Sequence, residues 1–174
     1  IINVGRLVDQ KDQITLLKAV NIIKDKIKFN LVIIGRGENK LKINEFLKKK
    51  NIGKFVKIFY TNNPFPYIKK SELFVLSSTF EGLPNVLLEA IVLKKFVISS
   101  KCPTGPKEIL DNQKGGFLYD TGNPILLAKK IMEFSKNKFH LRKKINHSYN
   151  RLYRFDYSKN LKKYLEVVNS LYNY

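Results

Sequence analysis

The sequence is poor in the residues that build disulfides and metal clusters. Among 174 residues there is one cysteine, Cys102, and two histidines, His140 and His147. One cysteine cannot form an internal disulfide, so a reducing compartment is the default expectation. These three side chains also cannot supply the spacing of a zinc site. Cys102 has no credible catalytic partner, and we expect it to be a small packed side chain after a strand.

Long apolar runs are absent as well. No stretch approaches the ~20 apolar residues that a membrane-spanning helix needs. Residues 1–5 have no basic leader region and no cleavage pattern, so they are not a signal peptide. They also lack an initiator methionine and open into an apolar run, which suggests a piece of a longer protein. With a reducing compartment as the default, we expect a cytoplasmic location. Hydrophobic residues make up 44% of the chain, which excludes a disordered chain. The length of 174 residues predicts one domain.

Acidic residues are scarce relative to basic ones. Asp and Glu number 14 against 33 Lys and Arg, a net charge of +19, and arginine supplies only five of the 33. One interpretation is a field that attracts nucleic acid, anionic lipid or polyphosphate. The other is a lysine-rich coding bias on a solvated surface, which we favour for most lysines. Twelve basic and three acidic residues fall within 124–174, so the excess is densest near the end of the sequence.

Strand-like and helix-like segments alternate along the chain. Apolar, β-branched runs predict strands at 1–4, 31–34, 55–59, 73–76, 96–99 and 116–119. Helical spacing predicts helices around 16–27, 41–50, 66–70, 86–93, 106–110, 124–135, 139–150 and 157–172. The last of these has an apolar stripe of Leu161, Leu165 and Val168. The order predicts a Rossmann-like α/β/α fold with a parallel sheet of about six strands and additional C-terminal helices. Ligands of such sheets bind beyond the carboxyl ends of the strands.

Two short segments after predicted strands carry candidate anion-binding groups. After the first strand, Gly5 allows close backbone approach, Arg6 offers a planar fork of donors, and Lys11 adds a charge near a helix start. Alone, this pattern is weak, because Lys11 could simply be solvated. After the second strand, residues 35–37 read Gly-Arg-Gly, for which a tight turn is a better interpretation than a dinucleotide fingerprint.

The segment at 80–90 is more informative. Gly82, Leu83, Pro84 and Asn85 form a predicted loop between the fourth strand and a helix that starts near Val86.

Free N–H groups at Asn85, Val86 and Leu87 would face the crevice at the strand ends. Glu81 and Glu89 flank them. Two carboxylates around such donors could bind the hydroxyls of a sugar and a ribose with phosphate between them. The alternative is that Glu81 is a turn residue and Glu89 an ordinary helix residue.

Glu81 and Glu89, separated by seven residues, resemble the E-x7-E signature of retaining glycosyltransferases with the GT-B fold, family 4 in particular. Three other stretches resemble the family in order and spacing: residues 4–12, 64–78 and 102–119. The resemblance runs from residue 2 to about residue 131. It covers the second, donor-binding domain of a GT-B enzyme, and it implies that 1–174 is that single domain without the N-terminal acceptor domain.

The resemblance also implies roles for individual positions. Arg6 and Lys11 match the diphosphate-binding pair, and Glu81 matches the catalytic-site glutamate that contacts the donor sugar. The segment Gly82, Leu83, Pro84, Asn85 and Val86 matches the sugar and phosphate loop, and Glu89 matches the ribose-binding glutamate. Fixed cations and N–H dipoles can stabilise a leaving diphosphate without a metal, and the sequence has no Asp-x-Asp motif.

Two positions depart from the family pattern. Tyr60 and Thr61 stand where a glycine often follows the third strand, which puts the nucleobase pocket in question. Lys94 and Lys95 stand where a glycine often precedes the fifth strand, a change expected to alter only a helix end.

The expected function is hexosyl transfer from a nucleoside-diphosphate sugar, expected to be UDP-linked, to a glycan or lipid-linked acceptor in surface polysaccharide synthesis. No metal or cofactor is expected, and this chain alone is expected to be inactive without its own N-terminal domain. A basic module for anionic membrane or nucleic acid is one alternative, with nucleic acid the less favoured partner. A non-catalytic nucleotide-binding relative is another. A combined hypothesis places the enzyme peripherally at the inner face of the plasma membrane.

Overall fold

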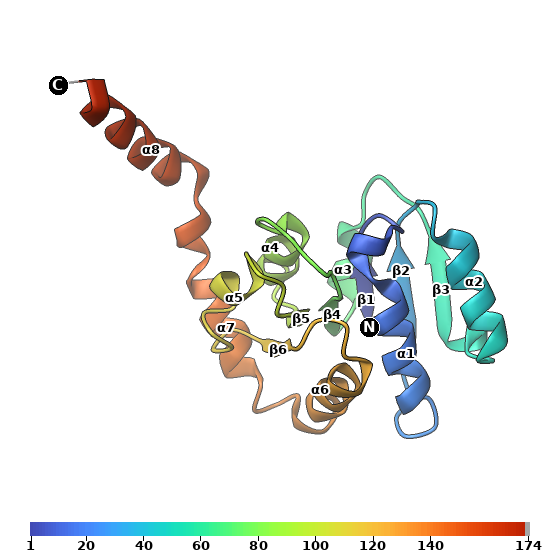
Figure 1. Cartoon of the computed structure of the whole chain (residues 1–174). Coiled ribbons are helices and arrows are strands. Elements are labelled where there is room, and N and C mark those ends of the chain that lie inside the picture. Colours follow the sequence, from blue (N-terminus) through green and yellow to red (C-terminus); the bar gives the residue numbers. More distant parts are fainter. Residues whose placement is uncertain (173–174) are drawn as a thin grey trace.

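The computed structural model describes residues 1–172 and contains a six-stranded parallel sheet (Figure 1). The strand order is β3-β2-β1-β4-β5-β6. The strands are β1 (Ile2–Val4), β2 (Leu31–Ile34), β3 (Val56–Phe59), β4 (Leu73–Leu76), β5 (Phe96–Ser100) and β6 (Phe117–Tyr119). All five neighbouring pairs are parallel. The predicted α/β fold with about six strands is therefore confirmed.

Eight α-helices connect and follow the strands within the described residues. They are α1 (Gln13–Ile23), α2 (Lys40–Lys49), α3 (Phe65–Lys70), α4 (Asn85–Val92), α5 (Pro106–Ile109), α6 (Pro124–Asn137), α7 (Arg142–Asn150) and α8 (Tyr157–Tyr172). Short 3₁₀ turns precede α1 (Asp9–Lys11), β3 (Gly53–Phe55) and α8 (Leu152–Phe155). Two predicted boundaries were wrong. Ile27 lies beyond the end of α1 at Ile23, although its N–H donates to the Ile23 carbonyl. Helix α7 begins at Arg142 rather than at residue 139.

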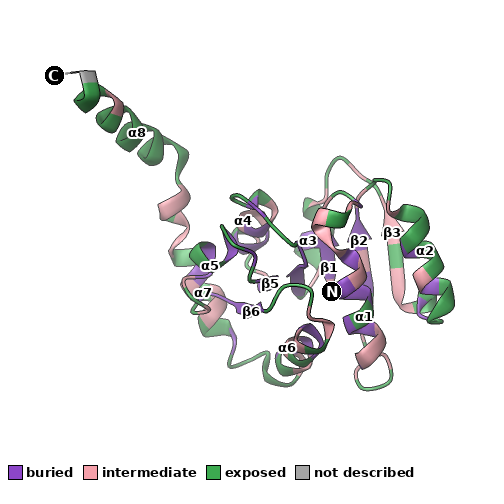
Figure 2. Ribbon diagram, in the orientation of Figure 1, coloured by how far each residue is buried: buried purple, intermediate pink, exposed green. Residues whose placement is uncertain are grey.

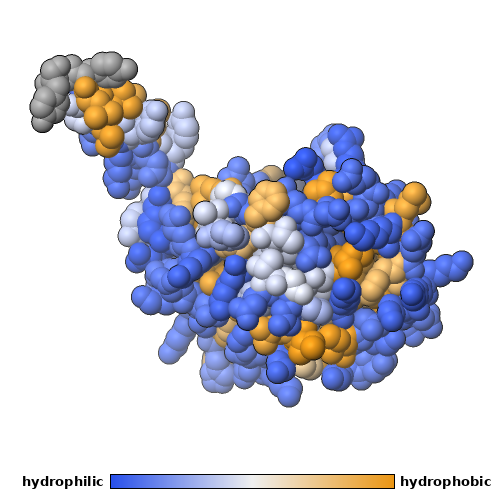
Figure 3. Space-filling view, viewed as in Figure 1, coloured by the Kyte–Doolittle hydropathy of each residue, from blue (hydrophilic) through white to orange (hydrophobic). Residues whose placement is uncertain are grey.

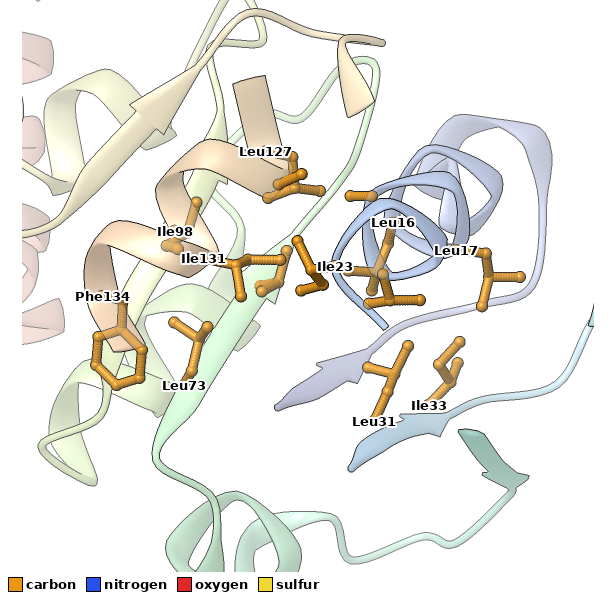
Figure 4. Packing of buried hydrophobic residues seen from close by; sticks show 14 of the residues in the cluster. Leu16, Leu17, Ile23, Leu31, Ile33, Leu73, Ile98, Leu127, Ile131 and Phe134 are labelled. Atoms are coloured by element: carbon orange, nitrogen blue, oxygen red, sulfur yellow. The ribbon is translucent and has the colours of Figure 1, made fainter. Parts of the chain in front are cut away.

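The central strands divide their side chains between two hydrophobic cores. In β4, Leu73 and Val75 join the core beneath α1, α2 and α6, whereas Phe74 and Leu76 join the core beneath α3, α4 and α5. Successive strand residues point to opposite faces, so a fully buried strand needs apolar residues at every position. Figure 4 shows the first core, where Leu127 and Ile131 of α6 lie beside the α1 residues. The uninterrupted apolar runs in the sequence reflect this two-sided cover.

The final helices continue past the sheet. Asp111 fixes α7 through His147, whose Nε2 lies 2.8 Å from the Asp111 carboxylate, and Arg151 lies 3.4 Å from the same oxygen. The His147 hydrogen bond is the main reason that the pKa of Asp111 is lowered. Beyond these contacts α8 extends away from the body of the fold (Figures 1 and 2). No described helix combines the length and apolar character that crossing a membrane would demand.

The strand order reverses direction between β1 and β4. The chain winds outward from β1 through β2 to β3, then returns to the other side of β1 and winds outward through β4, β5 and β6. In open α/β sheets this reversal separates the loops that follow the two central strands and opens a crevice at their carboxyl ends. The loops after β1 and β4 contain Arg6, Lys11 and Glu81, so the topology places the predicted site residues at this reversal.

Candidate functional site

Glycines let the loops after β1 and β2 lie against each other. A Cβ atom on Gly35 would lie 1.9 Å from the Gly5 carbonyl oxygen, and one on Gly37 would lie 2.4 Å from the Leu7 carbonyl oxygen. The Leu7 N–H donates to the Arg36 carbonyl at 2.9 Å. The glycines at 35 and 37 therefore serve a close loop crossing at the crevice rather than a dinucleotide fingerprint.

The predicted phosphate lysine is held across the crevice. Lys11 ends the 3₁₀ turn before α1, and its Nζ donates to Glu81 Oε1 at 2.6 Å. Both side chains are largely shielded, with 17% and 8% of their side-chain surface exposed. A Cβ atom on Gly5 would rest 3.6 Å from the Lys11 Cδ, so the lysine side chain passes directly over Gly5. The structure thus brings Gly5, Lys11 and Glu81 together, although 70 residues separate the ion pair.

Arg6 lies apart from this pair. It is exposed, its carbonyl accepts a hydrogen bond from Gln13 Nε2 at 2.9 Å, and its guanidinium makes no ion pair within residues 1–172. Arg6 and Lys11 occupy the same loop and give the crevice two cationic groups. One is tied to a carboxylate and the other faces solvent.

The loop before α4 leaves hydrogen-bond donors without protein partners. Within the described part of the chain, the N–H groups of Gly82, Leu83, Asn85 and Val86 bond no protein acceptor. A Cβ atom on Gly82 would meet nothing within 4 Å, so space remains beside this backbone. The expectation that Leu87 also presents a free N–H was wrong, because Pro84 caps α4 and its carbonyl accepts the Leu87 N–H at 2.9 Å.

Glu89 lies on the second turn of α4 and is half-buried. No hydrogen bond or ion pair to its carboxylate exists among residues 1–172. Burial away from water raises its pKa, because desolvation disfavours the charged form. A partly desolvated carboxylate with no cation of its own is suited to accept hydrogen bonds from neutral donors such as hydroxyls.

Sequence reasoning missed the polar residues that support this site. Ser77 and Ser78 directly follow β4 and are fully buried. The Ser77 hydroxyl donates to the Lys11 carbonyl at 2.7 Å, and the Ser78 hydroxyl donates to Glu81 Oε1 at 2.6 Å. From the loop after β5, the Thr104 hydroxyl donates to the Glu81 carbonyl. The sequence offered one signal for these residues, namely that two small polar residues, Ser77 and Ser78, follow an apolar predicted strand.

The two departures from the family pattern have different consequences. Tyr60 follows β3, and the Arg36 guanidinium lies 4.5 Å above its ring centre, so a cation–π pair lies beyond the carboxyl ends of β2 and β3. Lys94 adopts a left-handed conformation with φ of 53° after α4, the backbone geometry that glycine usually supplies at a helix end. The expected change at the helix end is present, but it is not confined there, because the Lys94 ammonium also lies 4.6 Å from the ring centre of Tyr149 in α7.

Hollows also lie at the opposite edge of the sheet from the predicted site residues. One of about 720 Å³ lies at the amino ends of the strands, lined by Ile1, Phe29, Phe55 and several lysines. None of the predicted site residues reaches it. Among residues 1–172, no three His, Cys, Asp or Glu side chains gather as metal ligands would. Cys102 is buried, as expected, and desolvation raises the pKa of its thiol.

Comparison with known proteins gives consistent matches. The family model for glycosyl transferases group 1 matches residues 1–151. An uncharacterized glycosyltransferase from Methanocaldococcus jannaschii is 43% identical over 111 residues, covering 63% of this chain and 27% of that protein. In Campylobacter jejuni, a GalNAc-alpha-(1->4)-GalNAc-alpha-(1->3)-diNAcBac-PP-undecaprenol alpha-1,4-N-acetyl-D-galactosaminyltransferase is 27% identical over 174 residues, covering 98% of this chain and 48% of that enzyme. The chain thus spans less than half the length of these relatives.

Solved structures share the fold. A variant of S. aureus TarM, in complex with UDP and other ligands, superposes with a TM-score of 0.88 at 24% identity and covers 97% of this chain and 35% of that chain. Anabaena HepE in complex with UDP superposes with a TM-score of 0.86 at 18% identity, covering 97% of this chain and 48% of that chain. At these identities the superpositions establish the architecture.

Proposed function

Since the chain belongs to the glycosyl transferases group 1 family, we propose that it is the nucleotide-sugar-binding domain of a retaining glycosyltransferase. The whole enzyme would transfer a hexosyl unit from a UDP-sugar to a glycan or lipid-linked acceptor with retention of anomeric configuration. The observation that carries the proposal is that Lys11, Glu81 and the N–H groups of the loop before α4 lie together where the strand order reverses, between β1 and β4. In this scheme residues 1–174 form one domain, of which 173 and 174 lie outside the described residues.

The binding groups match the charge that develops during transfer. When the bond between sugar and diphosphate breaks, the leaving UDP gains negative charge. Arg6, Lys11 and the loop N–H groups of Asn85 and Val86 would stabilise that charge, and the positive end of the α4 dipole would add to them. Lys11 has three donor hydrogens, so it can contact a phosphate oxygen while remaining bonded to Glu81. We propose that these groups serve the diphosphate without a metal ion.

Glu81 and Glu89 would bind the two ends of the donor. Glu81 lies at the loop, where its carboxylate would contact hydroxyls of the donor sugar beside the reacting bond. Retention would follow from front-side attack, in which the acceptor hydroxyl gives its proton to the departing diphosphate. Glu89 would accept hydrogen bonds from the ribose. UDP is the proposed nucleotide because the TarM variant and HepE were both solved with UDP.

The acceptor class is inferred from the curated relatives. The Campylobacter relative acts, by its name, on a saccharide linked to undecaprenol diphosphate, and an S. aureus relative is named for poly(ribitol-phosphate). We propose a lipid-linked or polymeric glycan acceptor, bound by the remaining part of the enzyme. Leu161 and Leu165 are exposed apolar residues of α8 and would face that part. Figure 3 shows hydrophobic side chains on the segment that projects from the body of the fold. Peripheral contact with an anionic membrane, through the basic residues of α7 and α8, remains part of the proposal.

Calorimetric titration of this chain with UDP, GDP and ADP tests the proposal. We expect UDP to bind with micromolar affinity, GDP and ADP more weakly, and transfer activity to be almost absent. Folded protein, verified by circular dichroism, that binds no nucleoside diphosphate would contradict the proposal. Sedimentation with neutral and anionic vesicles separates the basic-surface alternative, which requires salt-sensitive recovery only with anionic vesicles.

Glu89 offers a prediction in which stability and binding change in opposite directions. Its pKa is raised in the folded state, so its deprotonation costs folding stability as pH rises from the unfolded pKa through the folded pKa. Glu89→Gln is therefore expected to be at least as stable as wild type at pH 7. Loss of a charged acceptor should nevertheless weaken UDP binding by about tenfold. Thermal melts and calorimetry measure the two effects.

The ligand provides the control for Glu89. Removing the ribose hydroxyls, as in 2′,3′-dideoxy-UDP, should weaken binding to wild type but cause little further loss in Glu89→Gln. Equal losses in both proteins would show that Glu89 does not contact the ribose.

A further inference from the structure

Two adjacent buried serines at the end of β4 contact both partners of the Lys11–Glu81 pair. Ser77 donates to the Lys11 carbonyl at 2.7 Å, and Ser78 donates to Glu81 Oε1 at 2.6 Å. Both serines have 0% exposed surface. A buried hydroxyl that donates to a carboxylate fixes the orientation of that carboxylate. Rotation of the carboxylate would break the bond and leave a buried charge without a hydrogen-bond partner, which costs free energy.

The two bonds to the Glu81 carboxylate end on the same oxygen. Lys11 Nζ and Ser78 Oγ both donate to Oε1, and within residues 1–172 no donor contacts Oε2. The main chain is fixed as well, because Thr104 donates to the Glu81 carbonyl and Ser100 Oγ donates to the Ser78 carbonyl at 2.6 Å. The carboxylate is thus held by one oxygen, and the other accepts no hydrogen bond from residues 1–172.

We propose that Ser78 is a positioning residue that fixes the Glu81 carboxylate so that Oε2 faces the hydroxyls of the donor sugar. This inference rests on the proposed function and assigns a specific part of it. Lys11 alone cannot impose the orientation, because its flexible stem lets the ammonium follow a rotating carboxylate. Ser78 is attached to the strand by a short side chain and therefore supplies the rigid reference point. Its effect should fall on sugar recognition more than on the binding of UDP itself.

Calorimetry on this chain with UDP and with UDP-glucose, UDP-N-acetylglucosamine and UDP-N-acetylgalactosamine tests the inference. For whichever sugar nucleotide binds wild type tightest, Ser78→Ala should lose at least tenfold more affinity than it loses for UDP. Ser78→Cys has a similar shape and a weaker donor, and it should behave in the same way if the alanine variant folds poorly. Ser99→Ala is the matched control, because this serine is equally buried on β5 but its hydroxyl bonds only the Ser100 carbonyl.

The outcomes separate the two levels of the proposal. If wild type binds UDP and a sugar nucleotide but Ser78→Ala and Ser78→Cys lower both affinities equally, Ser78 is merely structural and the inference is overturned. A similar selective loss in Ser99→Ala would also overturn it, since any buried hydroxyl would then have the same effect. If wild type binds no nucleotide at all, the proposed function fails and the inference fails with it.

Discussion

Gly105→Ala is expected to destabilise the chain by about 3 kcal/mol and to remove its affinity for UDP-sugars. Gly105 has a φ of 83°, which alanine adopts only with strain. A Cβ atom there would also lie 2.1 Å from the Gly82 carbonyl oxygen and 2.6 Å from Pro84 Cδ. The loop before α4 would have to move, and with it the N–H groups proposed to bind the donor. Thermal denaturation should show a drop of about 10 °C.

Gly122→Ala is the matched control for this variant. Gly122 has a similar φ of 72°, but a Cβ atom there would meet nothing within 4 Å. It should therefore show only the backbone strain, about 1 kcal/mol, with UDP affinity unchanged. Equal melting shifts in the two variants would show that the loops at 82–84 and 104–105 do not approach as closely as the structure indicates.

Much of the fold could be predicted because its central strands are buried on both faces. The boundaries of β2 and β4 match their predicted ranges, since runs such as Leu73 to Leu76 place apolar residues in both cores. The 3₁₀ turn at Asp9–Lys11 was not predicted, because three residues carry no periodicity. Lys94 shows the limit of residue preferences, since a lysine adopts the left-handed conformation usual for glycine.

The sequence names the residues of the candidate site but does not predict the contacts among them. The spacing of Glu81 and Glu89 lies within one segment, so the sequence displays it directly. The Lys11–Glu81 pair depends on β1 and β4 being neighbours, and the sequence contains no local trace of that adjacency. Ser78 lies only three residues before Glu81, but the sequence does not show that its hydroxyl bonds the Glu81 carboxylate, on which its proposed role depends. The excess of basic residues, by contrast, can be read from the sequence in full, but most of the lysines do not belong to the candidate site.

Lys11→Met is expected to weaken UDP binding by about a hundredfold and to destabilise the chain by about 2 kcal/mol. The affinity falls because a charged donor proposed to bind the diphosphate is lost. The stability falls because Glu81, with 8% of its side-chain surface exposed, loses the cation that compensates its burial and keeps only Ser78. Methionine preserves the apolar stem that crosses Gly5. Calorimetry with UDP and denaturant unfolding measure the two effects.

A second substitution separates the two effects of Lys11. In Lys11→Met/Glu81→Gln the uncompensated charge is gone, so stability should return to within about 1 kcal/mol of wild type. UDP binding should remain as weak as in Lys11→Met, because UDP lacks the transferable hexosyl unit that residue 81 is proposed to contact. Lys42→Met is the control, since its ion pair with Asp9 is exposed and should contribute little to stability or binding. If UDP affinity recovered together with stability in the double variant, Lys11 would act on the fold of the site rather than on the diphosphate.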